Sequence, residues 1–147
     1  MAASPWAFYN IAKKRIGNGD ILLDAGIWKV VLSGSASNAS LATLSKTSQI
    51  TDELAVQGGY VAGGRTLSTV AWTIAGGSVK FDACDLIFTA SGANLSDIKY
   101  AVIHTSVGAV TSGYLLCWSK LSTAQFTVTT GNTLTIQMAA AGIFTLT

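Results

Sequence analysis

The most constraining feature of the sequence is a pair of adjacent glycines, Gly76-Gly77, set between two runs in which apolar residues alternate with others. Two-residue hairpin turns need a positive φ, which glycine adopts without steric cost, so this pair predicts a tight turn. Such a turn aligns two apolar pairs across the strands: Trp72 with Phe81 and Ile74 with Val79. Side chains alternate along a strand, so both pairs point to one face. Residues 68–83 therefore predict a β-hairpin with one buried, apolar face.

Short apolar or alternating runs continue along most of the chain, separated by turn residues rather than by helical patterns. We expect strands at residues 21–23, 27–33, 85–89, 99–104, 114–120, 126–129, 133–138 and 143–147. The strands at 126–129 and 133–138 are expected to pair as a second hairpin around residues 130–132, with Phe126 opposite Ile136. Short strands without intervening helices indicate an antiparallel sandwich or barrel, and the mixture of tight hairpins with longer connections favours a jelly roll. The prediction is an all-β fold, an antiparallel β-sandwich or jelly roll with a short N-terminal helix.

Residues 1–19 predict a helical N-terminal arm. Ser4 suits an N-cap and Pro5 suits the first helical position, whereas Gly17 and Gly19 suit the end of a helix. A helix of about three turns is marginal in isolation. Its apolar face is therefore expected to dock on the sheet or on a neighbouring subunit.

Residues 20–147 are expected to form a single β-sandwich domain, because 147 residues suffice for one core without staples. The stretch 33–51 is rich in Ser, Ala, Thr, Asn and Gln and predicts a long surface loop, with room for a helical turn near residues 41–44. Loops of this length in compact domains are usually functional arms or poorly ordered segments. Whether this one is ordered stays open at the level of sequence.

Charged residues make up only 11% of the chain, against roughly 25% in an ordinary soluble domain. A surface with so little charge repels its neighbours weakly, so the protein is expected to associate with partner subunits. The net charge of +2 is too small to indicate a nucleic-acid partner, and the only basic run, 13–15, suits the end of a helix. No apolar run approaches the ~20 residues of a membrane helix, so no membrane partner is expected, and the N-terminus has no signal-peptide pattern.

The sequence predicts no catalytic site. The single histidine, His104, ends an apolar strand with no nucleophile pattern beside it. Asp82 and Asp85 are three residues apart, which points them to opposite faces of an extended chain, so they are better interpreted as turn caps. We therefore expect a protein that is not an enzyme and has no small-molecule substrate.

No metal or cofactor is expected either. The two cysteines, Cys84 and Cys117, lie among apolar residues and with one histidine cannot complete a zinc site. Whether they are bridged stays open, although the lack of a secretion signal disfavours it. The second glycine-rich stretch contains Gly63 and Gly64, but no helix or Lys-Ser/Thr follows, so these glycines predict a bend or a close backbone approach rather than a phosphate loop.

Several stretches resemble those of small virion structural proteins of tailed bacteriophages. They are Lys-Lys-Arg-Ile-Gly at 13–17, Gly-Asp-Ile-Leu-Leu-Asp at 19–24, Trp-Lys-Val-Val-Leu at 28–32, Gly-Tyr-Val-Ala-Gly-Gly-Arg-Thr-Leu at 59–67, Val-Lys-Phe-Asp-Ala at 79–83, Lys-Tyr-Ala-Val-Ile at 99–103 and Gly-Ile-Phe-Thr-Leu-Thr at 142–147. The resemblance covers nearly the whole chain apart from residues 34–51, and the stretch at 59–67 is its most specific part.

The resemblance is closest to jelly-roll capsid decoration, or cement, proteins. It implies a protein made in the host cytoplasm that binds and stabilises the outer surface of the icosahedral head. The implied partners are the major capsid protein and further copies of the chain, as a dimer or trimer. Two alternatives stay open: a tail, head–tail connector or fibre-base subunit, and a receptor- or carbohydrate-binding knob.

Buried aromatic residues often dominate protein interfaces, so the aromatic N-terminal arm is the expected contact with the capsid. The hypothesis names four interface residues: Trp6, Phe8, Tyr9 and Ile11. The alternative is that these side chains dock on their own domain.

Overall fold

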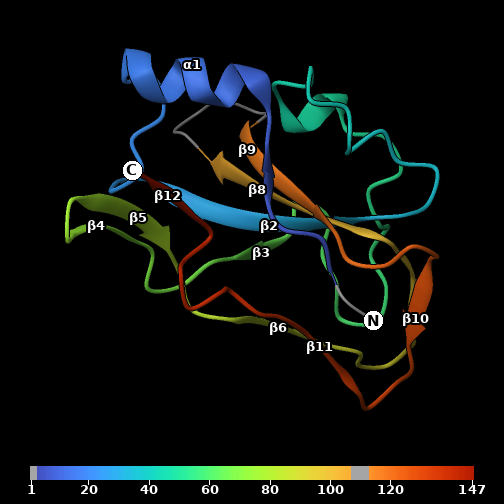
Figure 1. The fold of residues 1–147 in the computed structure, drawn as a ribbon. Coiled ribbons are helices and arrows are strands. Elements are labelled where there is room, and N and C mark those ends of the chain that lie inside the picture. Colours follow the sequence, from blue (N-terminus) through green and yellow to red (C-terminus); the bar gives the residue numbers. More distant parts are fainter. Residues whose placement is uncertain (1–2, 107–112) are drawn as a thin grey trace.

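The computed structural model describes residues 3–106 and 113–147 (Figure 1). Over these residues the chain is mostly β-structure in several antiparallel sheets, with one short α-helix, which confirms the all-β expectation. The elements in chain order are β1 (Ala7–Phe8), α1 (Asn10–Asn18), β2 (Ile27–Ser33), the 3₁₀-helix η1 (Thr47–Gln49), β3 (Arg65–Thr66), β4 (Ala71–Ala75), β5 (Ser78–Asp82), β6 (Leu86–Thr89), β7 (Leu95–Ile98), β8 (Tyr100–Ser106), β9 (Tyr114–Lys120), β10 (Phe126–Val128), β11 (Thr133–Ile136) and β12 (Phe144–Leu146).

The largest sheet has the strand order β1-β9-β8-β2-β3. Its centre is β8, which pairs antiparallel with β2 from Ile27↔Ser106 to Ser33↔Tyr100 and with β9 on its other edge. Every residue of β8 before Ser106 is buried, as the nearly continuous apolar run in the sequence predicts for a central strand. This sheet is the rigid platform on which the other elements pack.

Three smaller sheets, with the orders β12-β5-β4, β11-β6 and β10-β7, complete the β-structure of the described residues. In Figure 1 they lie on one side of the five-stranded sheet, and α1 lies on the other. The ring of Trp28 on β2 meets Phe81 on β5 edge to face at 5.1 Å between centroids, which joins the two layers. Burying one such aromatic side chain is worth about 1.5–3 kcal/mol, so this contact anchors the hairpin to the platform.

The predicted hairpin forms with the predicted register. Trp72 pairs with Phe81, Ile74 with Val79, and both loop glycines have positive φ, 58° at Gly76 and 85° at Gly77. The expectation of a fully buried apolar face is wrong at the loop end. Phe81 is completely buried, but Ile74 is 75% exposed, because the hairpin extends beyond the layer that would cover it. The most exposed large apolar side chain of the described residues therefore lies on this hairpin.

The N-terminal helix begins later than the sequence predicts. Ser4 and Pro5 do not open it; they precede the short strand β1, and α1 starts at Asn10. The reason is that the arm pairs with the outer edge of β9. The backbone N–H and C=O groups of that edge would lack partners if the arm were helical. The end of the helix is as predicted, since Gly19 caps it in the left-handed conformation with φ 78°.

The strand predicted at residues 21–23 does not form. The backbone N–H of Ile21 instead donates to the carbonyl of Arg15 and belongs to the C-terminal cap of α1. Ile21 and Leu23 are buried, whereas Leu22 is 57% exposed. The apolar triplet that indicates a strand in the sequence is therefore a helix cap that contributes two side chains to the core.

The long loop after β2 is held in place by hydrogen bonds. The phenol of Tyr9 donates to the carbonyl of Ala39 at 2.6 Å, and the side chain of Asn38 bonds the backbone of Gln49 and of Thr51. Ala39 and Leu44 are buried beneath it. Its one helical turn is η1, later than the predicted position near residues 41–44.

Candidate functional site

A groove of about 680 Å³ lies between the N-terminal segment and the strands β10 and β11. One wall is the extended chain of residues 3–6, and the other is β11 with the residues that follow it. The apolar side chains that line it are Pro5, Trp6, Leu121, Phe126, Leu134 and Ile136. Its polar side chains are Ser4, Ser119, Thr135 and Gln137. This volume lies within the roughly 300–1,000 Å³ of small-molecule pockets, and an open groove of this kind can also receive part of a partner chain.

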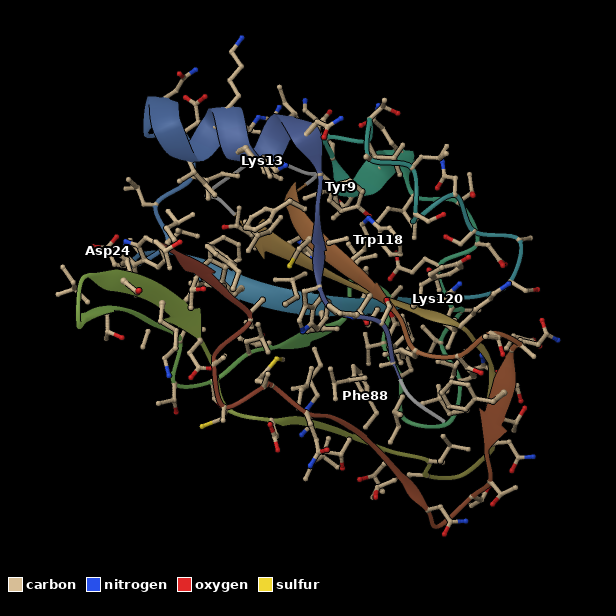
Figure 2. All side chains as sticks on the ribbon, in the orientation of Figure 1. Tyr9, Lys13, Asp24, Phe88, Trp118 and Lys120 are labelled. Atoms are coloured by element: carbon tan, nitrogen blue, oxygen red, sulfur yellow. The ribbon has the colours of Figure 1, made fainter. Side chains whose placement is uncertain are left out.

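Hydrogen bonds to the end of β9 fix the wall that carries Trp6. The N–H of Ser4 donates to the carbonyl of Lys120 at 2.9 Å, and the N–H of Lys120 donates to Oγ of Ser4 at 2.9 Å. Figure 2 labels Lys120 and Trp118, which both belong to β9. The hydroxyl of Ser119 donates to the carbonyl of Ser4 at 2.7 Å. These bonds hold Ser4 against the sheet, and the pairing of Ala7 with Trp118 holds the other end of the segment, so the backbone on both sides of Trp6 is bonded to β9.

Strand alternation decides where the aromatic arm residues point. Ala7 pairs with Trp118, so Trp6 and Phe8 point to the opposite face of the sheet from Ala7. On that face Phe8 meets Phe144 of β12, with ring centroids 4.5 Å apart, while Trp6 lines the groove. Phe8 is thus engaged within its own chain, and Trp6 is partly exposed.

The structure divides the four residues of the interface hypothesis. Tyr9 is fully buried, and the same burial, with a smaller contribution from nearby Cys117, raises the pKa of its phenol above the ordinary tyrosine value. Ile11 is half-buried on α1 and does not line the groove. Phe8 and Tyr9 therefore dock on their own chain, as the alternative interpretation supposed. Trp6 packs partly against the core of its own chain and also lines the groove, where a partner could meet it, while Ile11 stays half-exposed on α1.

The groove can bind but carries no acid–base chemistry. None of the described residues that line it has an ionisable side chain. Its hydroxyl and amide groups can exchange hydrogen bonds with a bound backbone or sugar. The arrangement suits contact with an apolar or polyhydroxyl surface.

His104 lies in a separate polar network. It is almost fully buried, its Nε2 is 3.4 Å from the carbonyl of Gly63, and desolvation lowers its pKa below the ordinary histidine value. Close by, a carboxylate oxygen of Glu53 accepts from the phenol of Tyr60 at 2.9 Å and from the N–H of Gly63 at 2.6 Å. The network fastens the glycine-rich stretch to the platform.

The glycine-rich stretch is a close backbone approach, as the sequence predicts. Gly63 and Gly64 have φ of 87° and 80°. A Cβ on Gly64 would overlap the carbonyl of Val30 on β2, whereas one on Gly63 would meet no atom within 4 Å. These glycines are turn and packing residues.

The other polar residues considered in the sequence have structural roles. Asp82 pairs with Lys80 at 2.9 Å and accepts from the N–H of Ala83, and Asp85 accepts from the N–H of Met138 at 2.8 Å, so both acids act as caps. Both cysteines are free thiols; Cys84 is exposed and Cys117 is buried.

No group of three or more His, Cys, Asp or Glu side chains that could hold a metal ion occurs among the described residues. No helix in the same part of the chain is long and apolar enough to span a membrane.

The three basic residues of α1 have different surroundings. Arg15 lies over the ring of Tyr114, 3.8 Å from its centroid, and donates to the carbonyl of Ser45. Lys13 and Lys14 are exposed.

Comparison of the chain with protein-family models, curated proteins and solved structures found no match. Sequence patterns had missed the far wall of the groove, because Phe126, Leu134 and Ile136 look like ordinary strand residues in isolation. The hairpin predicted from residues 126–129 and 133–138 is wrong, because β10 pairs with β7 and β11 pairs with β6, so Phe126 and Ile136 lie in two different sheets. These strands find their backbone partners in segments that are distant in the sequence, and no local pattern indicates them.

Proposed function

We propose that this chain is a non-enzymatic structural protein of a tailed-phage virion, and that it decorates the capsid as a cement protein. Its partners are the major capsid protein and further copies of the chain, and its location is the outer surface of the icosahedral head. The observation that carries the proposal is the groove beside Trp6: a fixed, mostly apolar recess without an ionisable group, on a chain with only 11% charged residues.

The mechanism is the addition of buried surface at junctions between capsid subunits. A protein that binds only the assembled shell stabilises that shell by mass action, without any reaction. A groove that receives a side chain or an extended arm of the capsid protein supplies the central, desolvated contact that interfaces need. The weakly charged surface around it lowers the cost of removing water from the rim.

We also propose that the fold is a β-sandwich of the jelly-roll type. Two observations support it. The smaller sheets face one side of the five-stranded sheet, and the aromatic residues Trp28, Phe81 and Phe144 fill the space between the layers. Such sandwiches present their loops and edges to partners while the core stays rigid.

The test uses phage heads that lack the chain and purified protein added back, with binding measured by co-sedimentation. Thr135→Lys places a charge in the groove at an exposed position of β11, so it should weaken binding to heads at least about tenfold. The matched control is Thr133→Lys, which is exposed on the same face of β11 but does not line the groove and should bind as the wild type does.

Equal binding by the two lysine variants and the wild type would contradict the groove as the docking site. Gold-labelled antibody against the chain, applied to purified virions, tests the location. Label over the head supports the decoration role. Label confined to the tail or the neck contradicts it and supports the tail or connector alternative.

A carbohydrate-binding knob remains a second candidate because of one feature of the groove. The indole of Trp6 lies in the same recess as the amide of Gln137 and the hydroxyl of Thr135, a combination that suits a sugar ring. Quenching or enhancement of tryptophan fluorescence by host surface glycans, abolished by Thr135→Lys, would favour this role. An unchanged spectrum with heads bound normally would exclude it.

A further inference from the structure

Strand β4 is an unprotected sheet edge. Among residues 3–106 and 113–147 it pairs only with β5, and Figure 1 shows the β4–β5 hairpin projecting at one end of the molecule. Natural proteins usually protect such an edge with a lysine, a proline, a bulge or a covering segment. The sequence of β4, Ala-Trp-Thr-Ile-Ala, contains no charge and no proline, and its pairing with β5 has no bulge.

The hairpin register determines which backbone groups of β4 have no hydrogen-bond partner on β5. The pair that flanks a two-residue loop, here Ala75–Ser78, is hydrogen-bonded, and hydrogen-bonded and non-hydrogen-bonded pairs then alternate. The backbone N–H and C=O groups of Trp72 and Ile74 consequently point away from β5. They form the row of donors and acceptors that an added strand would use.

This row is complementary to itself. If two β4 strands run antiparallel about a two-fold axis through Thr73, Trp72 of each copy lies opposite Ile74 of the other as a hydrogen-bonded pair. The indole packs on Phe144 of its own chain at 5.8 Å between centroids, and in this register its outer side lies beside Ile74 of the other copy, which is 75% exposed in the isolated chain. This one register thus gives the free backbone groups hydrogen-bond partners and also places an indole beside the most exposed large apolar side chain.

The charges near the edge also allow a second copy to approach. The nearest ones in the sheet are Lys80 and Asp82 on β5, and they form an ion pair with each other at 2.9 Å. Pairing two neutral β4 strands therefore brings no like charges together and leaves no charge unpaired. A charged foreign strand would have no counter-charge on β4.

We propose that the edge of β4 is a self-association site, through which two copies pair antiparallel about Thr73 and extend their three-stranded sheets into one. The contact is a short strand edge, smaller than the roughly 1,200 Å² typical of stable complexes, so the dimer is concentration-dependent. The proposal deepens the self-association named in the proposed function. It can nevertheless be tested on the purified chain alone.

The test exploits a row of three residues across the sheet: Thr73 on β4, Lys80 on β5 and Thr145 on β12. Thr73→Glu stays opposite a lysine within its own chain, but it places two carboxylates directly opposite each other at the two-fold axis. Thr145→Glu is the matched control, since Thr145 is also exposed and also lies opposite Lys80, on the other edge of the sheet.

Sedimentation velocity from about 10 µM to about 1 mM measures the association. We expect a monomer–dimer equilibrium for the wild type and for Thr145→Glu, and a dissociation constant at least about fivefold higher for Thr73→Glu, with an unchanged melting temperature. Mixing Thr73→Glu with Thr73→Lys should restore association, because the pair at the axis then carries opposite charges.

Three results would overturn the proposal. They are a wild type that stays monomeric throughout, an equal effect of both glutamate variants, and open-ended polymers, which indicate head-to-tail pairing of β4 with β12. Failure of the proposed virion role would look different, since heads would then not bind the chain whatever its oligomeric state. Conversely, heads bound equally by Thr73→Glu and the wild type would leave the groove's role intact without the β4 contact.

Discussion

At the scale of single residues, the structure separates positions that look alike in the sequence. Gly63 and Gly64 are neighbours with similar positive φ, yet only Gly64 lies against the backbone of β2. His104 ends a strand that the sequence marks as apolar, and its burial makes it a neutral core residue. In both cases the neighbours in space, rather than the residue type, set the energetic role.

The first prediction concerns this pair of glycines. Gly64→Ala should cost about 3 kcal/mol of stability or more, because its Cβ would overlap the carbonyl of Val30 and that backbone must move. Gly63→Ala carries only the left-handed strain of about 1–2 kcal/mol, since its Cβ would meet no atom within 4 Å. Urea unfolding of both variants measures the difference. Equal losses would contradict the close approach of this stretch to β2.

The second prediction is a pH dependence caused by His104. Its pKa is lowered mainly by desolvation, opposed by carbonyls of Gly63 and Thr105, with Lys29 lowering and Glu53 raising it. The unfolded chain therefore binds a proton at a higher pH than the folded chain does, and stability falls as the pH drops below the ordinary histidine value of about 6.5. The slope for one proton is at most about 1.4 kcal/mol per pH unit.

Unfolding free energies measured from about pH 7.5 to about pH 5 test this contribution. His104→Gln cannot take up the proton, so its stability should fall less over the same range. The carboxylates titrate in both proteins and cancel in the comparison. Parallel pH profiles would contradict a buried neutral histidine.

At the scale of elements, the N-terminal segment is the clearest conflict between local preference and packing. Ser4-Pro5 is a good helix start, but the edge of β9 offers the same residues more hydrogen bonds as an extended strand. The triplet at 21–23 is the reverse case, an apolar run used to end a helix rather than to form a strand. In both, the backbone partners available nearby decided the conformation.

The third prediction measures how firmly that segment is held. Ser4→Ala removes the hydroxyl that accepts from the N–H of Lys120, a part-buried bond, and should cost about 1 kcal/mol. It should also weaken binding of heads, because this bond helps fix the groove wall. Ser35→Ala is the control: its hydroxyl bonds Gln125 at an exposed site and should cost no more than about 0.5 kcal/mol. Thermal unfolding and head binding of both variants check the two effects.

At the scale of the whole molecule, a weakly charged chain leaves two kinds of surface for partners. One is the recess beside Trp6, closed on both sides by fixed backbone, and the other is the bare edge of β4. The two surfaces suit different interactions. The recess suits apolar side chains, and the edge of β4 suits backbone hydrogen bonds. In the two proposals made above, the recess would contact the capsid shell and the edge of β4 would contact a second copy of the chain.

The elements whose signals are local can be read from the amino-acid sequence alone. The Gly76-Gly77 turn sets the hairpin register, Gly19 ends the helix, and the apolar run of β8 marks the central strand, because turn geometry and side-chain alternation act over a few residues. The all-β class follows from the sum of these signals. Trp6 as an interface residue stays a prediction that the groove supports.

Only the tertiary structure decided what depends on contacts between distant residues. The far wall of the groove, the burial of Tyr9 under the loop at Ala39 and the exposure of Ile74 at the hairpin end arise from segments that meet only after the sheets pack. A residue's own pattern fixes which way its side chain points along a strand, but not whether another layer covers it. Coverage decides between core and surface, and it is a property of the folded molecule.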